Sequence, residues 1–321
     1  MKTKVLLIIL LQLLVISFLI FYITERQKKS SRTLSFSPIK KENIVFNPSA
    51  NLKFFYEPKE NSMEEQSKDW LKEKITYTIN SDSLNDRFNY SIDKRPDTYR
   101  IIALGDSFTF GQFVNTFENY PERLEDLLNN NMRCKSIKRF EVINLGVYGY
   151  DLAYAVERFR IRGVKYNPDL VLWIIGSSNL MQINEYMKPR NGAIEALNKN
   201  SKRASQNDKN KYYAAWETAR NEMISNLGKE AIRKYQLGAF NRFKKLYDGQ
   251  VITFGFLDDE SQRFMQKLVE SRPKTIYYKN IPYIYSTQGA AYPDFHPSSL
   301  GDKMIAEDIF GYLKENIISC N

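Results

Sequence analysis

The sequence predicts an α/β fold, in which helices cover both faces of a parallel sheet. Five short apolar runs alternate with segments of helical periodicity from about residue 98 to the end of the 321-residue chain. Runs that are apolar throughout are typical of strands buried on both faces. Glycine directly follows three of them, at Gly105, Gly146 and Gly176, where we expect the chain to leave the sheet. The predicted strands are 99–104, 140–145, 169–175, 251–256 and 275–278.

Helices are predicted between most of these strands and after the last one. Three leucines spaced for one face predict a helix over 121–131. The last helix has Ser299 as its candidate N-cap, with Asp302 three residues later. The segment 186–249 is too long for an ordinary crossover, so we interpret it as a largely helical insertion over the carboxyl edge of the sheet. The predicted helices are 121–131, 151–162, 258–270 and 299–317.

The N-terminus predicts one transmembrane helix that anchors the chain. Residues 5–23 carry no charge and, at about 1.5 Å per residue, just span a hydrocarbon core of about 30 Å. The run ends in bulky residues, Phe21-Tyr22-Ile23, and the first alanine is Ala50, which disfavours the alternative of a cleaved signal peptide. Basic residues flank the run on both sides, and the positive-inside rule alone slightly favours a cytoplasmic domain. We nevertheless expect a single-pass membrane protein whose main domain is exported from the cytoplasm.

The chain divides into three predicted parts. Residues 1–32 hold the anchor and its basic flank, and residues 33–97 form a linker and N-terminal extension with a strand over 74–80. Residues 98–321 form the α/β domain, including the helical insertion.

The composition excludes several classes of protein and of site. With 14 Gly, 11 Pro and 14% aromatic residues, the chain is neither collagen-like nor wholly disordered. One histidine, His296, and two cysteines, Cys134 and Cys320, cannot form a multi-histidine metal site or a four-cysteine zinc site, and we predict no cofactor. Whether the two cysteines pair cannot be read from the sequence. The net charge of +10 comes partly from the flank of the anchor, and no motif predicts binding to nucleic acid.

Polar residues gather at the edge where parallel sheets bind ligands, after three strands and before the last helix. Ser107 lies in a Gly-Asp-Ser turn, and a serine hydroxyl becomes a good nucleophile only when a base removes its proton. His296 is the only imidazole available as that base, and Asp294 is near enough in sequence to orient it. The backbone N–H groups of Ser107 and Gly146, with a side chain near Asn179, are candidate donors to an oxyanion.

These residues resemble the motifs of the SGNH, or GDSL, hydrolase family over about residues 98–316. The resemblance implies a three-layer α/β/α fold with a five-stranded, flavodoxin-like sheet, and serine esterase or lipase chemistry. It also implies that Ser107 is the nucleophile, His296 the base and Asp294 the third member of a triad. The matching segments are Gly105-Asp-Ser, Gly146, Gly176-Ser-Ser-Asn and Asp294-Phe-His.

Two segments depart from the family pattern. Where the family has Gly-x-Asn-Asp, a gap-free match places Ser178 at the oxyanion asparagine, whereas a shift of one residue places Asn179 there. Asn179 is the better donor chemically, because an amide offers two N–H groups. Asp294 precedes His296 by two residues instead of three, so a Ser–His dyad is an alternative to a full triad.

The sequence thus predicts a membrane-anchored serine esterase that forms an acyl-enzyme. Its expected substrate is an acyl ester, either on an envelope polysaccharide, where acetyl is a candidate group, or on a small molecule. The alternatives are an acyltransferase acting on a glycan and a non-catalytic envelope or carbohydrate-binding module with the same fold. Some aromatic residues are candidates for a sugar site, but packing is the preferred interpretation for them: Tyr148, Tyr150, Tyr212 and Trp216.

Overall fold

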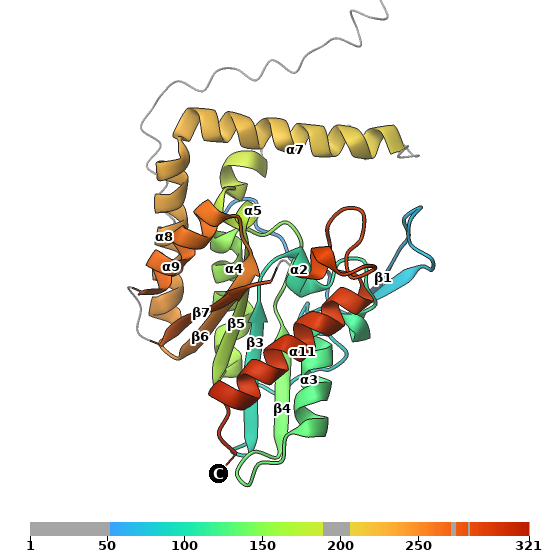
Figure 1. Cartoon of the computed structure of the whole chain (residues 1–321), viewed down its shortest axis with the longest axis vertical. Helices are drawn as coiled ribbons and strands as arrows, with labels where there is room; N and C mark the ends of the chain where they lie inside the picture. The colour runs from blue at the N-terminus through green and yellow to red at the C-terminus, as the bar shows by residue number, and fades with distance from the viewer. Residues whose placement is uncertain (1–51, 189–205, 271–273, 282, 321) are drawn as a thin grey trace, which may run out of the picture. The chain divides into compact units, whose positions relative to one another are not determined.

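The computed structural model describes residues 52–188, 206–270, 274–281 and 283–320. Its main sheet has five parallel strands in the order β4-β3-β5-β6-β7 (Figure 1). Counted along the chain, this is the flavodoxin-like order 2-1-3-4-5. All five predicted strands are confirmed: β3 (Thr98–Leu104), β4 (Arg139–Asn144), β5 (Leu170–Gly176), β6 (Gln250–Phe256) and β7 (Thr275–Asn280).

Two apolar layers cover the two faces of this sheet. Along β3, Ile101 and Ala103 face one layer and Ile102 and Leu104 face the other, because successive side chains of a strand point to opposite faces. The first face packs against α3 (Tyr120–Asn131) and α11 (Ser299–Asn316), and the second against α4 (Leu152–Arg158), α8 (Lys229–Leu246) and α9 (Asp259–Glu270) (Figure 1). The layered arrangement of the α/β prediction is therefore confirmed.

The long helices lie close to their predicted ranges, with one difference at a cap. The side chain of Ser298 caps α11 by accepting the N–H of Gly301, whereas Ser299, the predicted cap, donates its hydroxyl to Glu118 at 2.8 Å. Short helical segments connect the larger elements: α2 (Ser107–Phe110), η1 (Thr116–Glu118), the π-helical turn η2 (Phe159–Gly163), η3 (Val164–Tyr166), α5 (Ser177–Leu180) and α10 (Tyr283–Ser286).

The helical insertion over 186–249 supplies α7 (Gln206–Leu227) and α8. The expectation that it lies over the carboxyl edge of the sheet is wrong for α8. Phe240 and Phe243 of α8 pack on Trp173 of β5, with ring centroids 5.8 and 4.9 Å apart, so α8 covers a face of the sheet. It does so because its buried aromatic residues recur at helical spacing and need an apolar partner.

The N-terminal extension contributes a two-stranded antiparallel hairpin, β1 (Ser62–Gln66) and β2 (Ile75–Ile79). The strand predicted over 74–80 is thus confirmed. The hairpin packs behind α2: the hydroxyl of Tyr77 accepts the N–H of Phe113 at 2.7 Å.

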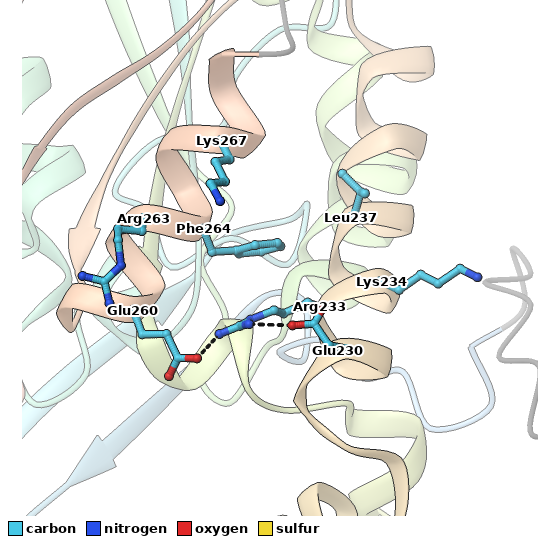
Figure 2. A pocket seen from close by; sticks show the side chains of 8 residues that line it. All are labelled: Glu230, Arg233, Lys234, Leu237, Glu260, Arg263, Phe264 and Lys267. Atoms are coloured by element: carbon cyan, nitrogen blue, oxygen red, sulfur yellow. Dashed lines mark hydrogen bonds and ion pairs between the residues drawn. The ribbon is translucent and has the colours of Figure 1, made fainter.

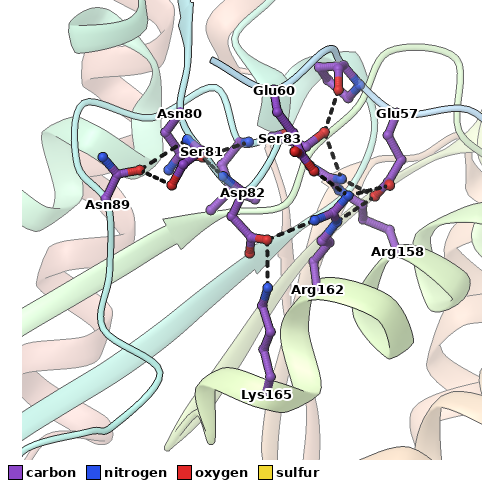
Figure 3. A network of polar contacts seen from close by, with 12 residues as sticks. Glu57, Glu60, Asn80, Ser81, Asp82, Ser83, Asn89, Arg158, Arg162 and Lys165 are labelled. Carbon is purple, nitrogen blue, oxygen red and sulfur yellow. Dashed lines mark hydrogen bonds and ion pairs between the residues drawn. The ribbon is translucent and has the colours of Figure 1, made fainter.

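Charged side chains join the extension to the segment around α4 (Figure 3). Glu57 accepts hydrogen bonds from Arg158, which is fully buried, and from Arg162 at 2.9 Å. Asp82 accepts from Arg162 at 2.8 Å and from Lys165 at 2.6 Å. The described residues accordingly belong to one compact unit, and residues 1–45 lie outside the described residues.

Two further features concern the ends of the chain. Within the described ranges, no helix is long and apolar enough to cross a membrane, and the predicted anchor over 5–23 lies outside these ranges.

Cys134 and Cys320 form a disulfide that joins the segment after α3 to the C-terminal end, 186 residues later. The pairing that the sequence left open is therefore present.

Candidate active site

Ser107 is the first residue of α2, directly after the turn that follows β3. Asp106 caps this short helix, since its Oδ1 accepts the N–H of Phe108 at 3.0 Å. Gly111 ends the helix in the left-handed conformation, with φ at 80°, which glycine adopts readily. The turn holds Ser107 at the carboxyl edge of the sheet.

His296 lies in a tight loop shortly before α11. The N–H of Phe295 donates to the carbonyl of Tyr292 at 2.9 Å, and the N–H of Tyr292 donates to the carbonyl of His296 at 2.8 Å. Phe295 has a φ of 69°, which is rare for a bulky residue. Asp294 Oδ1 accepts the N–H of His296 at 3.3 Å, as in an Asx turn. The loop therefore brings Asp294 and His296 face to face although one residue separates them.

Three side chains form a hydrogen-bonded series at this edge. His296 Nε2 lies 2.9 Å from Ser107 Oγ, and His296 Nδ1 lies 3.1 Å from Asp294 Oδ2. With a proton on Nδ1, the ring donates to Asp294 and accepts the Ser107 hydroxyl at Nε2. The spacing of two residues between Asp294 and His296, instead of three, is thus compatible with the geometry of a Ser–His–Asp triad.

The surroundings of Asp294 favour its ionised form. Burial raises the pKa of Asp294, but hydrogen bonds and charge attraction from His296 outweigh burial and hold this pKa below the ordinary value of a carboxyl. An ionised carboxylate at Nδ1 fixes the tautomer of the ring and stabilises the imidazolium that forms when Nε2 takes a proton.

Aromatic rings enclose His296. Phe108 stacks on the imidazole with centroids 5.2 Å apart, and Phe113 meets it edge-on at 5.4 Å. Trp70 of the N-terminal extension packs on Phe113 at 5.0 Å and on Tyr292 at 4.8 Å. No motif marks these aromatic residues, so the sequence does not identify them, and the extension contributes to the wall behind the imidazole.

The backbone donors predicted for an oxyanion differ in how they are engaged. Ser107 begins α2, so its N–H has no acceptor within the helix. The N–H of Gly146 donates to Asn144 Oδ1 at 2.9 Å. A Cβ at Gly146 would overlap the backbone of Thr109 and Phe110, so this glycine lets the loop after β4 pass close to α2. Gly146 therefore has a packing role, and its N–H reaches an oxyanion only by leaving Asn144.

Asn179, the predicted side-chain donor, is engaged elsewhere. Its Nδ2 donates to Asp106 Oδ2 at 2.8 Å and to the carbonyl of Tyr150 at 2.9 Å, and its Oδ1 accepts the N–H of Gly176 at 2.6 Å. Both amide hydrogens are used, so the geometry does not support Asn179 as the oxyanion donor. Ser178, the alternative donor of the gap-free match, is exposed.

Asx turns recur in three loops at this edge. Asp106, Asn144 and Asp294 each accept the N–H of the residue two positions later. Aspartate and asparagine favour such turns because a short side-chain oxygen can replace a backbone acceptor. An Asx residue two positions before Gly146 is therefore the sequence signal for Asn144 as the acceptor of the Gly146 N–H.

The aromatic residues considered for a sugar site have different surroundings. Tyr150 is buried, and Trp216 is partly buried against the apolar layer that contains α4, which confirms packing for both. Tyr148 is 41% exposed. The side chain of Tyr212 lies outside the described residues.

A separate groove of about 420 Å³ lies between α8 and α9 (Figure 2). Its lining combines four basic residues with two acidic ones, and Arg233 binds both Glu230, at 2.8 Å, and Glu260. The groove contains none of the residues of the Ser107–His296–Asp294 series.

Comparisons with known proteins found weak similarity to solved structures. No protein-family model matches the chain, and no curated protein matches it. A catalytic mutant of an acetylxylan esterase from Geobacillus stearothermophilus is 13% identical with a TM-score of 0.41, over 70% of this chain and 97% of that one. A lipase/acylhydrolase from Enterococcus faecalis is 14% identical with a TM-score of 0.40, over 67% of this chain and 95% of that one. A two-domain esterase active on acetylated mannans is 14% identical with a TM-score of 0.39, over 69% of this chain and 50% of that one.

At these identities and TM-scores the similarities carry no argument about fold or activity. The five parallel strands of this chain have the flavodoxin-like order, and its Ser, His and Asp motifs meet at the carboxyl edge. These motifs resemble those of the SGNH, or GDSL, hydrolases, with departures at Gly176-Ser-Ser-Asn and at the spacing of Asp294 from His296.

Proposed function

We propose that the chain is a serine ester hydrolase that acts through an acyl-enzyme on Ser107. The observation that carries the proposal is the series in which His296 lies 2.9 Å from Ser107 and 3.1 Å from Asp294. A serine hydroxyl requires a base to become nucleophilic, and His296 is the only imidazole in the chain. A non-catalytic module would not require a buried hydroxyl aligned with an oriented imidazole.

In the acylation step, Ser107 Oγ attacks the ester carbonyl while His296 Nε2 takes the hydroxyl proton. Asp294 stabilises the imidazolium. The N–H of Ser107 and the hydroxyl of Ser178 are the proposed donors to the oxyanion. Collapse of the tetrahedral intermediate breaks the bond to the alcohol oxygen, which leaves with the proton from Nε2, and the acyl group stays on Ser107.

In the deacylation step, water attacks the acyl-enzyme and gives its proton to His296 Nε2. The second tetrahedral intermediate releases the carboxylic acid, and Ser107 recovers its proton. Transfer of the acyl group to a sugar hydroxyl would follow the same path with an alcohol in place of water. No feature of the described residues favours the alcohol, so hydrolysis is the proposed reaction.

The proposal is tested with glycerol triesters of increasing chain length, with acid release followed at constant pH. Wild-type protein should hydrolyse at least one of them, and Ser107→Ala should lower kcat by several orders of magnitude, up to about 10⁶. Ser136→Ala, which changes an exposed serine before β4, is the matched control and should keep wild-type activity. Hydrolysis that survives Ser107→Ala, or no hydrolysis of any triester, would contradict the proposal.

We also propose that residues 5–23 anchor the enzyme in a membrane and that the α/β domain lies outside the cytoplasm. The disulfide between Cys134 and Cys320 supports this location, because disulfides persist mainly in oxidising compartments. In intact cells, a protease added from outside should then degrade the domain while a cytoplasmic control protein survives. Protection of the domain until the cells are lysed would place it in the cytoplasm.

A further inference from the structure

Four aromatic rings form a continuous strip that begins beside His296. Phe108 stacks on the imidazole and contacts Phe256, with ring centroids 4.6 Å apart. Phe256 contacts Tyr285 at 5.5 Å, and Tyr285 contacts Phe295 at 6.2 Å. We call the four residues Phe108, Phe256, Tyr285 and Phe295 the aromatic strip.

The strip becomes more exposed with distance from the reacting groups. Its rings come from α2, the end of β6, α10 and the His296 loop. Phe108 and Phe256 are partly buried, whereas Tyr285 is 42% exposed and Phe295 is 69% exposed. Large apolar side chains that lie side by side in contact with solvent mark a binding surface more often than a packing defect.

The conformation of Phe295 also argues for a role outside folding. Its φ of 69° is unfavourable for a residue with a bulky side chain, and its ring gains little from burial at 69% exposure. Asn, Asp or Gly would adopt this backbone conformation more easily. The ring of Phe295 is therefore open to a ligand on the side that does not contact Tyr285.

We propose that the aromatic strip binds the alcohol part of the ester, and that this alcohol is a pyranose ring stacked on the aromatic faces. This inference rests on the proposed ester hydrolase activity. The leaving oxygen must lie at His296 Nε2 to receive its proton. Phe108 stacks on that same imidazole, so the strip begins next to the group that would protonate the leaving oxygen.

The composition of the strip favours a sugar ring over an alkyl chain. All four members are aromatic, and the outer two are open to solvent. An alkyl chain is bound best where apolar walls enclose it, because its binding energy follows the area removed from water. An aromatic face carries partial negative charge, which attracts the polarised C–H groups on one face of a pyranose.

The test compares two acetyl esters, glucose pentaacetate, which contains a pyranose ring, and glycerol triacetate, which does not. Tyr285→Ala should lower the ratio of kcat/KM for the pentaacetate to kcat/KM for the triacetate by about tenfold. Tyr285→Phe keeps the ring and should retain the wild-type ratio. Tyr285→Leu keeps apolar bulk but loses the flat face, and should behave like the alanine variant. Phe117→Ala removes a ring that is 57% exposed outside the strip, and should leave the ratio unchanged.

The outcomes separate this inference from the activity on which it rests. If Ser107-dependent hydrolysis of the triacetate is present but Tyr285→Ala does not change the ratio, or the pentaacetate is not hydrolysed, the inference is overturned and the proposed function stands. A second result would also overturn the inference by assigning the strip to the acyl chain. In that result, Tyr285→Leu restores the wild-type ratio, and Tyr285→Ala lowers kcat/KM more for glycerol tridecanoate than for glycerol triacetate. Absence of Ser107-dependent hydrolysis of both acetyl esters and of every longer glycerol triester contradicts the proposed function itself.

Discussion

Glu125 should make the protein less stable as the pH rises from 5 to 8. Burial raises the pKa of this carboxyl to about 7, although the N–H of Val142 at 2.7 Å and the hydroxyl of Tyr90 at 2.9 Å donate to it. The carboxyl lies in α3 near a second buried acid, Asp86, which accepts the same Tyr90 hydroxyl at 3.1 Å. Glu125 is 4% exposed, so solvent screens its surroundings little.

The size of the effect follows from the difference in pKa between the two states. The ordinary pKa of a glutamate carboxyl is 4.5. Well below this pH, Glu125 is protonated in both the folded and the unfolded chain, so its titration does not change the free energy of unfolding. Between pH 4.5 and about 7, the unfolded chain ionises while the folded chain does not, so unfolding becomes progressively more favourable. Above about pH 7 both states are ionised and the loss is complete. At about 1.4 kcal/mol per pH unit, the loss is about 3 kcal/mol.

The assay is urea unfolding at pH 5 and pH 8 of protein that begins at residue 33, for the wild type and for Glu125→Gln. Burial also raises the pKa of Asp86, so both proteins should lose stability, but the wild type should lose about 3 kcal/mol more than the variant. Glu64→Gln changes an exposed glutamate of β1 and is the control, with wild-type pH dependence expected. Equal losses in the wild type and Glu125→Gln would refute the reasoning.

Three other changes test the site and the disulfide. Asp294→Asn should lower kcat by about 10⁴ with little change in Tm, because the wrong imidazole tautomer is then favoured, and a loss below tenfold would indicate a Ser–His dyad. Ser178→Ala should lower kcat by about 10²–10³ at unchanged Tm, as expected for an oxyanion donor. Asn179→Ala should mainly lower the free energy of unfolding in urea, by about 1–3 kcal/mol, because it leaves buried partners without hydrogen bonds, and the reverse pattern for these two variants would return Asn179 to the oxyanion site. Reduction of the Cys134–Cys320 bond with dithiothreitol should lower the free energy of unfolding by about 2–5 kcal/mol, and identical urea curves with and without reductant would contradict a stabilising role.

The sheet could be predicted because its strands are short and each contains an apolar stretch. All seven residues of β5 are buried, as the uninterrupted apolar run over 170–175 indicates. The place of α8 could not be predicted in the same way. Helical periodicity identifies which face is apolar, but not which surface it covers, and the contact of Phe240 and Phe243 with Trp173 joins segments about 70 residues apart.

The candidate site could be predicted where residue type and position along the chain are sufficient. Ser107 and His296 follow from a turn motif and from the presence of a single imidazole. The contact between Asp294 and the imidazole of His296 could not be predicted. It depends on the positive φ of Phe295, a torsion that the residue pattern does not encode. The hydrogen bonds of Asn179 come from two distant segments, so the sequence could not show that its amide is engaged by Asp106 and Tyr150.

The aromatic strip and the wall formed by the extension could not be anticipated either. Phe256, Tyr285 and Trp70 carry no motif and meet the site only through the order of the strands and the packing of the hairpin. Single aromatic residues in a sequence are more often part of the core, which is why their exposure had to come from the structure.

The claim that Ser107 is an activated nucleophile is tested most directly with a fluorophosphonate probe, which forms a stable adduct with a serine activated by a base. Intact-mass measurement of folded wild-type protein should show one adduct, and peptide mapping should place it on Ser107. Ser107→Ala and His296→Ala should show none, whereas Ser136→Ala should be labelled like the wild type. An adduct on another serine, or no adduct on folded wild-type protein, would contradict the account.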